Sequence, residues 1–198
     1  VPFLKASIAL IGVAEKGVMD VRVTATGAGG HASMPPEVTS LDVLSQALIR
    51  IRKNPMPARI TGTAHAFLKA LGAHVDGVLG WILRHSRLTA PLIKRVFAGN
   101  AKTGALIRTT MAPTMAKGAQ APNVLPSSAE LILNCRVLPG DSIQSVLSHL
   151  RTVVADLPVT VELRSGDSPA SDPVPETLTD TTIYRAIADT AQEVFPDA

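Results

Sequence analysis

Two stretches of the chain alternate between apolar and polar residues, the pattern of a β-strand with one buried face. They span residues 18–26 and, more regularly, residues 129–138. Residues 107–117 and 159–163 are rich in apolar or β-branched side chains and are predicted as two further strands. Because Pro113 has no amide hydrogen to donate, we expect the 107–117 strand at a sheet edge or interrupted by a bulge.

Apolar residues at helical spacing predict two amphipathic helices between these strands. The first is expected to begin with Thr39 or Ser40 as its cap and to run to about residue 53. The second is expected to begin with Asp141 or Ser142 as its cap and to run to about residue 154. Their apolar stripes are Leu41, Leu44, Leu48 and Ile51 in the first, and Ile143, Val146, Leu147, Leu150, Val153 and Val154 in the second.

Residues 63–108 contain apolar residues at helical spacing that glycines and a proline interrupt, which predicts several short helices in an insertion. We expect Trp81 in the core of this insertion. A cluster of basic residues would allow a membrane-surface role, but packing and solvated charge explain it, so a membrane partner is not expected. The cluster consists of Arg84, His85, Arg87, Lys94 and Arg95.

Both ends of the chain contain further predicted elements. Residues 7–14 are a continuous apolar run typical of a buried strand, followed by a turn at Glu15-Lys-Gly17. Residues 165–175 are rich in Ser, Pro and Asp and are predicted as a linker. Residues 179–194 predict a last amphipathic helix with an inward stripe of Ile183, Ile187, Ala191 and Val194.

The order of the central elements is strand, helix, insertion, strand, strand, helix, strand. This order predicts an α+β, ferredoxin-like fold with a four-stranded antiparallel sheet and two helices on one face. One edge of such a sheet would remain available for pairing with another chain.

Composition narrows the classes of function. The 198 residues are 46% apolar, which excludes a disordered chain. A net charge of +3 with scattered Lys and Arg, and only 3% aromatic residues, argue against a nucleic-acid partner. The single cysteine, Cys135, allows no internal disulfide and is predicted as a buried thiol. No apolar run reaches the ~18–20 residues of a membrane span.

Three polar side chains stand in glycine- and proline-rich or apolar surroundings and are the candidate site residues. His31 follows Gly29 and Gly30, Asn123 lies between prolines, and Arg136 interrupts an alternating strand. Together an imidazole, a carboxamide and a guanidinium could bind a carboxylate or a developing oxyanion. The three glycines of the loop that contains His31 allow backbone angles that are closed to other residues, and they also allow close approach by a ligand.

Each candidate also has a structural explanation. The ring of His31 could bond the backbone of its own turn. The side chain of Asn123 could form an Asx turn beside Pro122. Arg136 could form a surface ion pair on the outer face of its strand. Ser33 could cap or contact a substrate.

Five motifs, in this order, resemble those of one enzyme family. The chain is similar to the lid, or dimerisation, domain of the aminoacylase and carboxypeptidase S family of di-zinc metallopeptidases over roughly residues 10–165. The motifs are Glu15-Lys-Gly17, Gly29-Gly-His-Ala-Ser-Met-Pro35, Thr109-Thr-Met-Ala-Pro-Thr114, Asn123-Val-Leu-Pro126 and Arg136-Val-Leu-Pro-Gly140.

The resemblance implies a domain organisation. Residues 1–16 would be the end of a catalytic domain, and residues 17–168 the lid domain with its helical insertion at about 62–106. Residues 169–198 would be a linker and a helix that returns to the catalytic domain. We therefore expect the chain to be a piece of a longer enzyme.

The resemblance also implies a function, that of a homodimeric zinc carboxypeptidase or N-acyl-amino-acid amidohydrolase. His31 would stabilise the oxyanion in the partner subunit's active site, Asn123 would bind the substrate's carbonyl or carboxylate, and Arg136 its terminal carboxylate. The full-length enzyme would hold two zinc ions. This chain lacks the family's ligand motifs, and His74-Val-Asp76 has no second ligand set, so we expect no zinc and no activity in the fragment alone. The alternative is a non-catalytic, dimeric ferredoxin-like module that binds a small ligand or acts as a scaffold.

Overall fold

A computed structural model describes residues 9–164, 169–177, 179 and 181–196 of the chain. The chain divides into two compact units, each considered by itself. One unit contains Lys16–Pro57 and Thr109–Pro173. The other contains Ala58–Arg108 together with the segments up to Glu15 and from Val174 onward.

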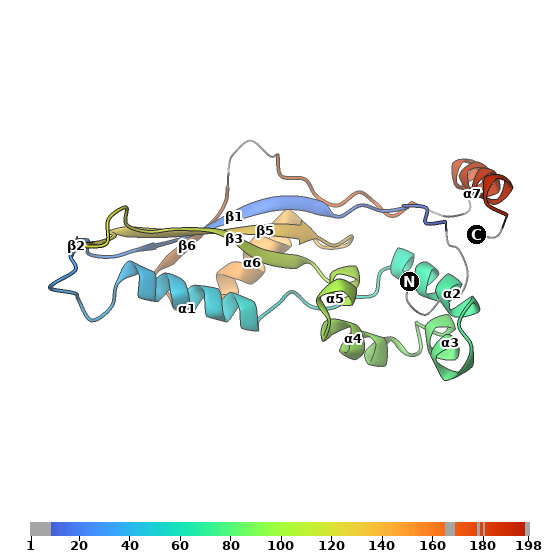
Figure 1. The fold of residues 1–198 in the computed structure, drawn as a ribbon, viewed down its shortest axis with the longest axis horizontal. Helices are drawn as coiled ribbons and strands as arrows, with labels where there is room; N and C mark the ends of the chain where they lie inside the picture. The colour runs from blue at the N-terminus through green and yellow to red at the C-terminus, as the bar shows by residue number, and fades with distance from the viewer. Residues whose placement is uncertain (1–8, 165–168, 178, 180, 197–198) are drawn as a thin grey trace. The chain divides into compact units, whose positions relative to one another are not determined.

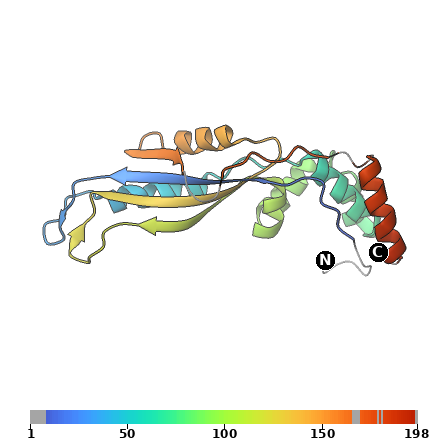
Figure 2. The same ribbon diagram turned by 90° about the horizontal axis from the view of Figure 1, so that it is seen from above.

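A four-stranded antiparallel sheet forms the first unit. Its strands are β1 (Gly17–Thr26), β3 (Thr110–Lys117), β5 (Ser128–Val137) and β6 (Val159–Leu163), in the order β3-β5-β1-β6 (Figure 2). Helices α1 (Ser40–Lys53) and α6 (Ile143–Val153) cover one face of this sheet (Figure 1). The predicted ferredoxin-like arrangement of four strands and two helices is confirmed.

The core of this unit lies between the sheet and its two helices. Strands β1 and β5 pair over ten positions, from Gly17 opposite Val137 to Thr26 opposite Ser128. Every second side chain points into the core, because alternation along a strand sends one set to each face. The buried set is Met19, Val21, Val23 and Ala25 on β1, and Ala129, Leu131, Leu133, Cys135 and Val137 on β5.

Strand β3 lies at the edge of the sheet, and its register shifts between Pro113 and Met115. Both the edge position and the irregularity agree with the prediction from Pro113. The strand begins three residues later than expected, because Ile107 is the last residue of helix α5 (Ala101–Ile107).

Side-chain caps determine where the two packing helices begin. Thr39 caps α1 and Ser142 caps α6, each within a capping box. The stripe predicted for α1 is only partly correct. Leu41 is 44% exposed and lies beside Gly118, whereas Val43 and Ala47 are buried against the sheet.

The insertion in the second unit consists of α2 (Gly62–Ala73), α3 (Gly77–Arg84), α4 (Ala90–Ala98) and α5, and its core centres on Leu68, Leu83 and Ile93. Two glycines expected to break helices lie inside them instead. A Cβ at Gly80 would collide with the carbonyl of Val75, and one at Gly72 would lie 2.8 Å from the Leu83 side chain. Their small size therefore lets α2 and α3 pack closely.

Two apolar surfaces that were predicted to be buried are exposed. Trp81 in α3 is 47% exposed, so it does not belong to the insertion core. On the last helix, α7 (Thr182–Val194), the expected inward residues Ile183, Ile187 and Val194 are exposed. Amphipathic spacing correctly indicates an apolar helix face, but it does not show that the face is buried.

The strand expected at residues 7–14 is also not found. Residues 9–14 belong to no strand, and residues 7 and 8 lie outside the described part. Among the described residues, the stretch 9–15 is joined to residues 174–177 by two backbone hydrogen bonds, Val174 N to Glu15 O (3.1 Å) and Thr177 N to Val13 O (2.8 Å). Two such bonds are too few for a strand ladder. The predicted 165–175 linker is described from residue 169, and Ser171 forms an isolated bridge with Val18.

Candidate functional site

His31 and Asn123 lie together in a small two-stranded ribbon at one end of the sheet unit. Strand β2 (Gly30–His31) pairs antiparallel with β4 (Val124–Leu125), and His31 is opposite Val124. The backbone N–H of Ala32 donates to the carbonyl of Asn123 at 3.0 Å. In Figure 1 this ribbon lies at the far end of the unit, beyond the end of β1.

The glycines before His31 provide space and not unusual backbone angles. Among the described residues, only Gly77 and Gly140 have a positive φ, so the loop glycines do not use the left-handed angles that glycine allows. A Cβ at Gly29 would lie 3.2 Å from the Ser127 side chain and 3.3 Å from the Leu125 carbonyl. Glycine therefore lets the two segments of the ribbon approach each other.

Ser33 determines which nitrogen of the His31 ring carries the proton. The backbone N–H of Ser33 donates to Nδ1 at 3.2 Å, and the Ser33 hydroxyl lies 2.8 Å from the same atom. Because Nδ1 accepts this N–H bond, a neutral ring carries its hydrogen on Nε2. The ring thus bonds the backbone of its own turn through Nδ1, which was the structural alternative considered for His31. Its Nε2–H remains a donor. His31 itself is exposed.

The side chain of Asn123 is not used to form its turn. The turn is closed by the backbone, because Val124 N donates to the Ala121 carbonyl at 3.2 Å. The exposed carboxamide of Asn123 forms no hydrogen bond with any described residue, so the Asx-turn explanation does not hold. This leaves the carboxamide available to a ligand.

Arg136 is exposed near the other end of β5. It pairs with Val18 on one side and with Thr110 on the other. Its guanidinium forms no hydrogen bond or ion pair within the described part of the chain. The surface ion pair considered as an alternative is therefore not present there.

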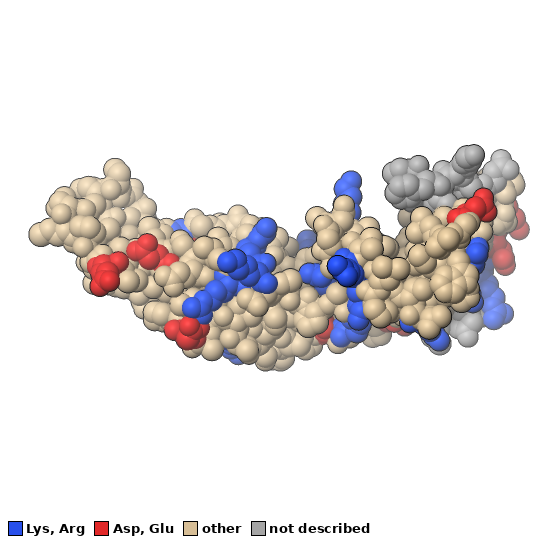
Figure 3. Space-filling view, turned by 90° about the horizontal axis from the view of Figure 1, so that it is seen from below, with Lys and Arg blue, Asp and Glu red and all other residues tan. Residues whose placement is uncertain are grey.

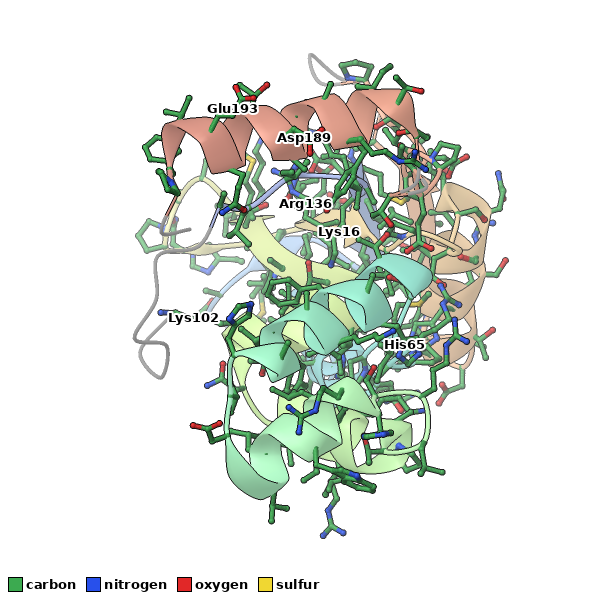
Figure 4. All side chains as sticks on the ribbon, turned by 90° about the vertical axis from the view of Figure 1, so that its right-hand side faces the viewer. Lys16, His65, Lys102, Arg136, Asp189 and Glu193 are labelled. Carbon is green, nitrogen blue, oxygen red and sulfur yellow. The ribbon has the colours of Figure 1, made fainter. Side chains whose placement is uncertain are left out.

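Lys16 is a second cation beside Arg136, and sequence reasoning gave it no role. It precedes β1 by one residue and is diagonal to Arg136 across the β1–β5 pair, a separation that long side chains can span. Figure 4 shows the two labelled residues close to each other, as the register requires. Partial burial lowers the pKa of Lys16, and the nearby Asp141 acts in the opposite direction. The sequence motif Glu15-Lys-Gly17 contains this lysine, but its position beside Arg136 can be recognised only from the register of β1 and β5.

Arg136 and the His31–Asn123 ribbon lie at opposite ends of the same sheet. Arg136 is eight residues from Ser128 along β5, which corresponds to roughly 26 Å at ~3.3 Å per residue. Strand β4 comes before Ser128, so the ribbon lies beyond that end of β5. One copy of the chain therefore cannot bring His31 and Arg136 onto the same small substrate.

The residues that the structure describes do not fit a zinc centre. None of them form a group of three or more His, Cys, Asp or Glu side chains that could hold a metal ion. His74 and Asp76 occupy the end of α2 and the start of α3, and both are exposed. No described helix is both long and apolar enough to cross a membrane.

Comparison with known proteins gives one family match and several relatives. A family model described as the peptidase dimerisation domain of M20 peptidases matches residues 13–162. The human N-fatty-acyl-amino acid synthase/hydrolase PM20D1 is 36% identical over the whole chain, which spans 39% of that protein. The probable carboxypeptidase S-like 2 of Dictyostelium discoideum is 31% identical over 99% of the chain, which spans 37% of its length.

Solved structures share the fold at low sequence identity. Human carnosine dipeptidase 1 has a TM-score of 0.54 at 15% identity, covering 98% of this chain and 44% of its own. The dipeptidase Dug1p of Saccharomyces cerevisiae has a TM-score of 0.56 at 13% identity, with the same coverage. The chain spans less than half of each protein compared here, and it is related to M20 peptidases and amidohydrolases over one part of them. The chain belongs to the M20 peptidase dimerisation domain family.

Proposed function

We propose that this chain is the lid and dimerisation domain of a homodimeric hydrolase that cleaves N-acyl amino acids or peptides with a free carboxylate. The placement of His31 and Asn123 at one end of the sheet and of Arg136 at the other supports this proposal most strongly. These side chains reach one substrate only if they come from two copies of the chain. The names of the relatives, a fatty-acyl-amino acid hydrolase and a carboxypeptidase, support the substrate class.

Arg136 binds the substrate's carboxylate in this proposal. A guanidinium presents parallel N–H donors that match two carboxylate oxygens, and this one is exposed and unpaired among the described residues. Lys16 beside it adds positive charge at the same end of the sheet. Free carboxylate substrates would therefore be preferred to the corresponding esters.

His31 stabilises the oxyanion that forms when the substrate's amide carbonyl is attacked in the partner subunit's active site. Its Nε2–H is the donor, because the Ser33 N–H holds Nδ1 as an acceptor. Asn123 binds the substrate's carbonyl or carboxylate beside His31. A preorganised donor at a developing oxyanion contributes ~2.7–4 kcal/mol in comparable sites.

The metal centre implied by the family lies outside this chain in the proposal. No set of ligands for it exists among the described residues, and the roles of His31, Asn123 and Arg136 are derived without it. The isolated chain is then inactive.

Kinetics of the full-length protein test the proposal. His31→Ala should lower kcat about 10²–10³-fold, with metal content and KM little changed. Arg136→Ala should raise KM for a free carboxylate substrate and have little effect on its methyl ester. His149→Ala is the matched control, because within the described part of the chain the ring of His149 bonds the Asn54 carbonyl alone. An unchanged kcat in His31→Ala would favour the non-catalytic module.

A further inference from the structure

The segment Ala58–Arg108 differs sharply in charge from the rest of the chain. It contains eight of the 19 Lys and Arg residues but only one of the 16 acidic residues, Asp76, which gives a formal charge of +7. The remainder of the chain therefore has a formal charge of −4. Residues 77–108 contain no Asp or Glu at all.

Apolar side chains are exposed on the same part of the insertion. They come from α3, from the turn at residues 85–88, and from α4, which Leu83 and Ile93 join in one small core. Trp81 is 47% exposed although sequence analysis placed it in the core, and Leu88 is 74% exposed. We call this surface the α3–α4 patch; its apolar members are Val78, Leu79, Trp81, Leu88, Leu92 and Val96.

Cations lie among these apolar side chains. Arg84, Arg87 and Arg95 are exposed on the same three elements. Figure 3 shows Lys and Arg spread among uncharged residues where it views α3 and α4. The indole of Trp81 stacks against His85 with ring centroids 4.8 Å apart, which leaves an amphipathic ring at the surface.

This combination has the chemistry of a membrane-interface site. Apolar side chains gain by entering the boundary between headgroups and acyl chains, tryptophan favours that depth, and Lys and Arg are attracted to anionic headgroups. The phosphates of a nucleic acid would bind the cations, but they would make no favourable contact with the exposed valines and leucines. An acidic protein surface that lacks apolar groups would likewise leave the apolar side chains without partners.

We propose that the α3–α4 patch docks the protein on the surface of an anionic phospholipid bilayer. The inference does not depend on the proposed enzymatic function. It differs from the expectation that packing and solvated charge explain this segment, because the structure leaves about half or more of each of these apolar side chains exposed.

Vesicle flotation of the full-length protein tests the proposal. The protein should float with vesicles that contain phosphatidylglycerol, bind much less to vesicles of phosphatidylcholine alone, and be released when salt is raised from about 0.05 M to about 0.5 M. Exchanging Arg84, Arg87 and Arg95 together for Glu should lower the partition coefficient by at least about 100-fold, since each lost basic residue contributes about fivefold and each Glu adds repulsion.

Two controls separate the patch from net charge and from general hydrophobicity. Exchanging Arg52, Lys53 and Lys117 for Glu makes the same change in charge on exposed positions of the sheet unit and should leave most binding intact. Trp81→Ser should weaken binding more than Ile49→Ser, whose side chain is 53% exposed on α1.

Three outcomes would overturn the proposal. They are no binding to the anionic vesicles, equal binding to both kinds of vesicle, and equal loss in the two charge-reversed proteins. Thermal melts confirm folding of each variant, and Arg95→Glu alone replaces the triple variant if that protein does not fold. Membrane docking and hydrolysis are measured separately, so failure of one does not affect the other.

Discussion

Subunit complementation is the sharpest consequence of placing His31 and Arg136 at opposite ends of one sheet. The experiment uses full-length subunits with two different affinity tags, one carrying His31→Ala and the other Arg136→Ala. At a substrate concentration well below KM, each homodimer should be nearly inactive. The mixed dimer, purified through both tags, distinguishes shared active sites from sites built within one subunit.

The expected activity follows from the geometry. Arg136 lies roughly 26 Å along β5 from Ser128, whereas a substrate's carboxylate and scissile carbonyl are within about 5 Å of each other. Each site therefore takes Arg136 from one subunit and His31 from the other. In the mixed dimer one site keeps both residues and the other lacks both, so hydrolysis should be half that of the wild-type dimer.

A reciprocal dimer provides the control. It pairs a wild-type subunit with one that carries both substitutions. With shared sites, each of its two sites lacks one residue and activity is lost, although the dimer contains the same two substitutions. If the first mixed dimer is inactive and the reciprocal one retains half of the activity, each site is built within one subunit and our reasoning is wrong.

Three further predictions concern stability and reactivity. Thr109→Ala should destabilise the domain by about 1–3 kcal/mol, because the buried Thr109 hydroxyl accepts from Leu138 N at 2.8 Å. Thr109→Ser keeps the hydroxyl and should retain most of the stability. Equal denaturant midpoints for the Ala and Ser variants would contradict this reasoning. Thr39→Ala should cost about 1 kcal/mol through loss of the α1 cap and Thr39→Ser much less, a difference that urea unfolding should resolve. Burial raises the pKa of the Cys135 thiol to about 12, so iodoacetamide at neutral pH should label it only after unfolding. The unfolded thiol ionises near pH 9, whereas the folded thiol stays protonated. The free energy of unfolding should therefore fall by about 1 kcal/mol between pH 9 and pH 10, compared with the Cys135→Ala protein. Parallel pH profiles of the two proteins would count against this.

The parts of the fold that could be predicted are those whose cause is local. Strand β5 was evident because burial of one face imposes period-two alternation on its own residues. Thr39 and Ser142 were among the expected caps because a hydroxyl at that position bonds the first free amides of its helix. Pro113 indicated an edge or a bulge because its missing amide hydrogen is a property of the residue itself.

The parts of the fold and of the site that could not be predicted depend on contacts with segments that are distant in the sequence. Strands β2 and β4 have two residues each, too few to show any period, and they form by pairing with each other. An apolar stripe shows which side of a helix avoids water but not whether another element covers it, so Trp81 was misplaced. The role of Lys16 was missed because its position beside Arg136 follows from the β1–β5 register.

The length of strand β5 sets the distance between Arg136 and His31 of the same chain. In the proposed dimer, Arg136 binds a carboxylate in one active site and His31 acts in the active site of the partner subunit. Removing two residues from β5 together with their two partners on β1 would preserve the inward and outward faces but shorten the span by about 6–7 Å. Because Arg136 and His31 of one chain would serve different active sites, the number of residues in this strand would then set the spacing between the two sites of the dimer.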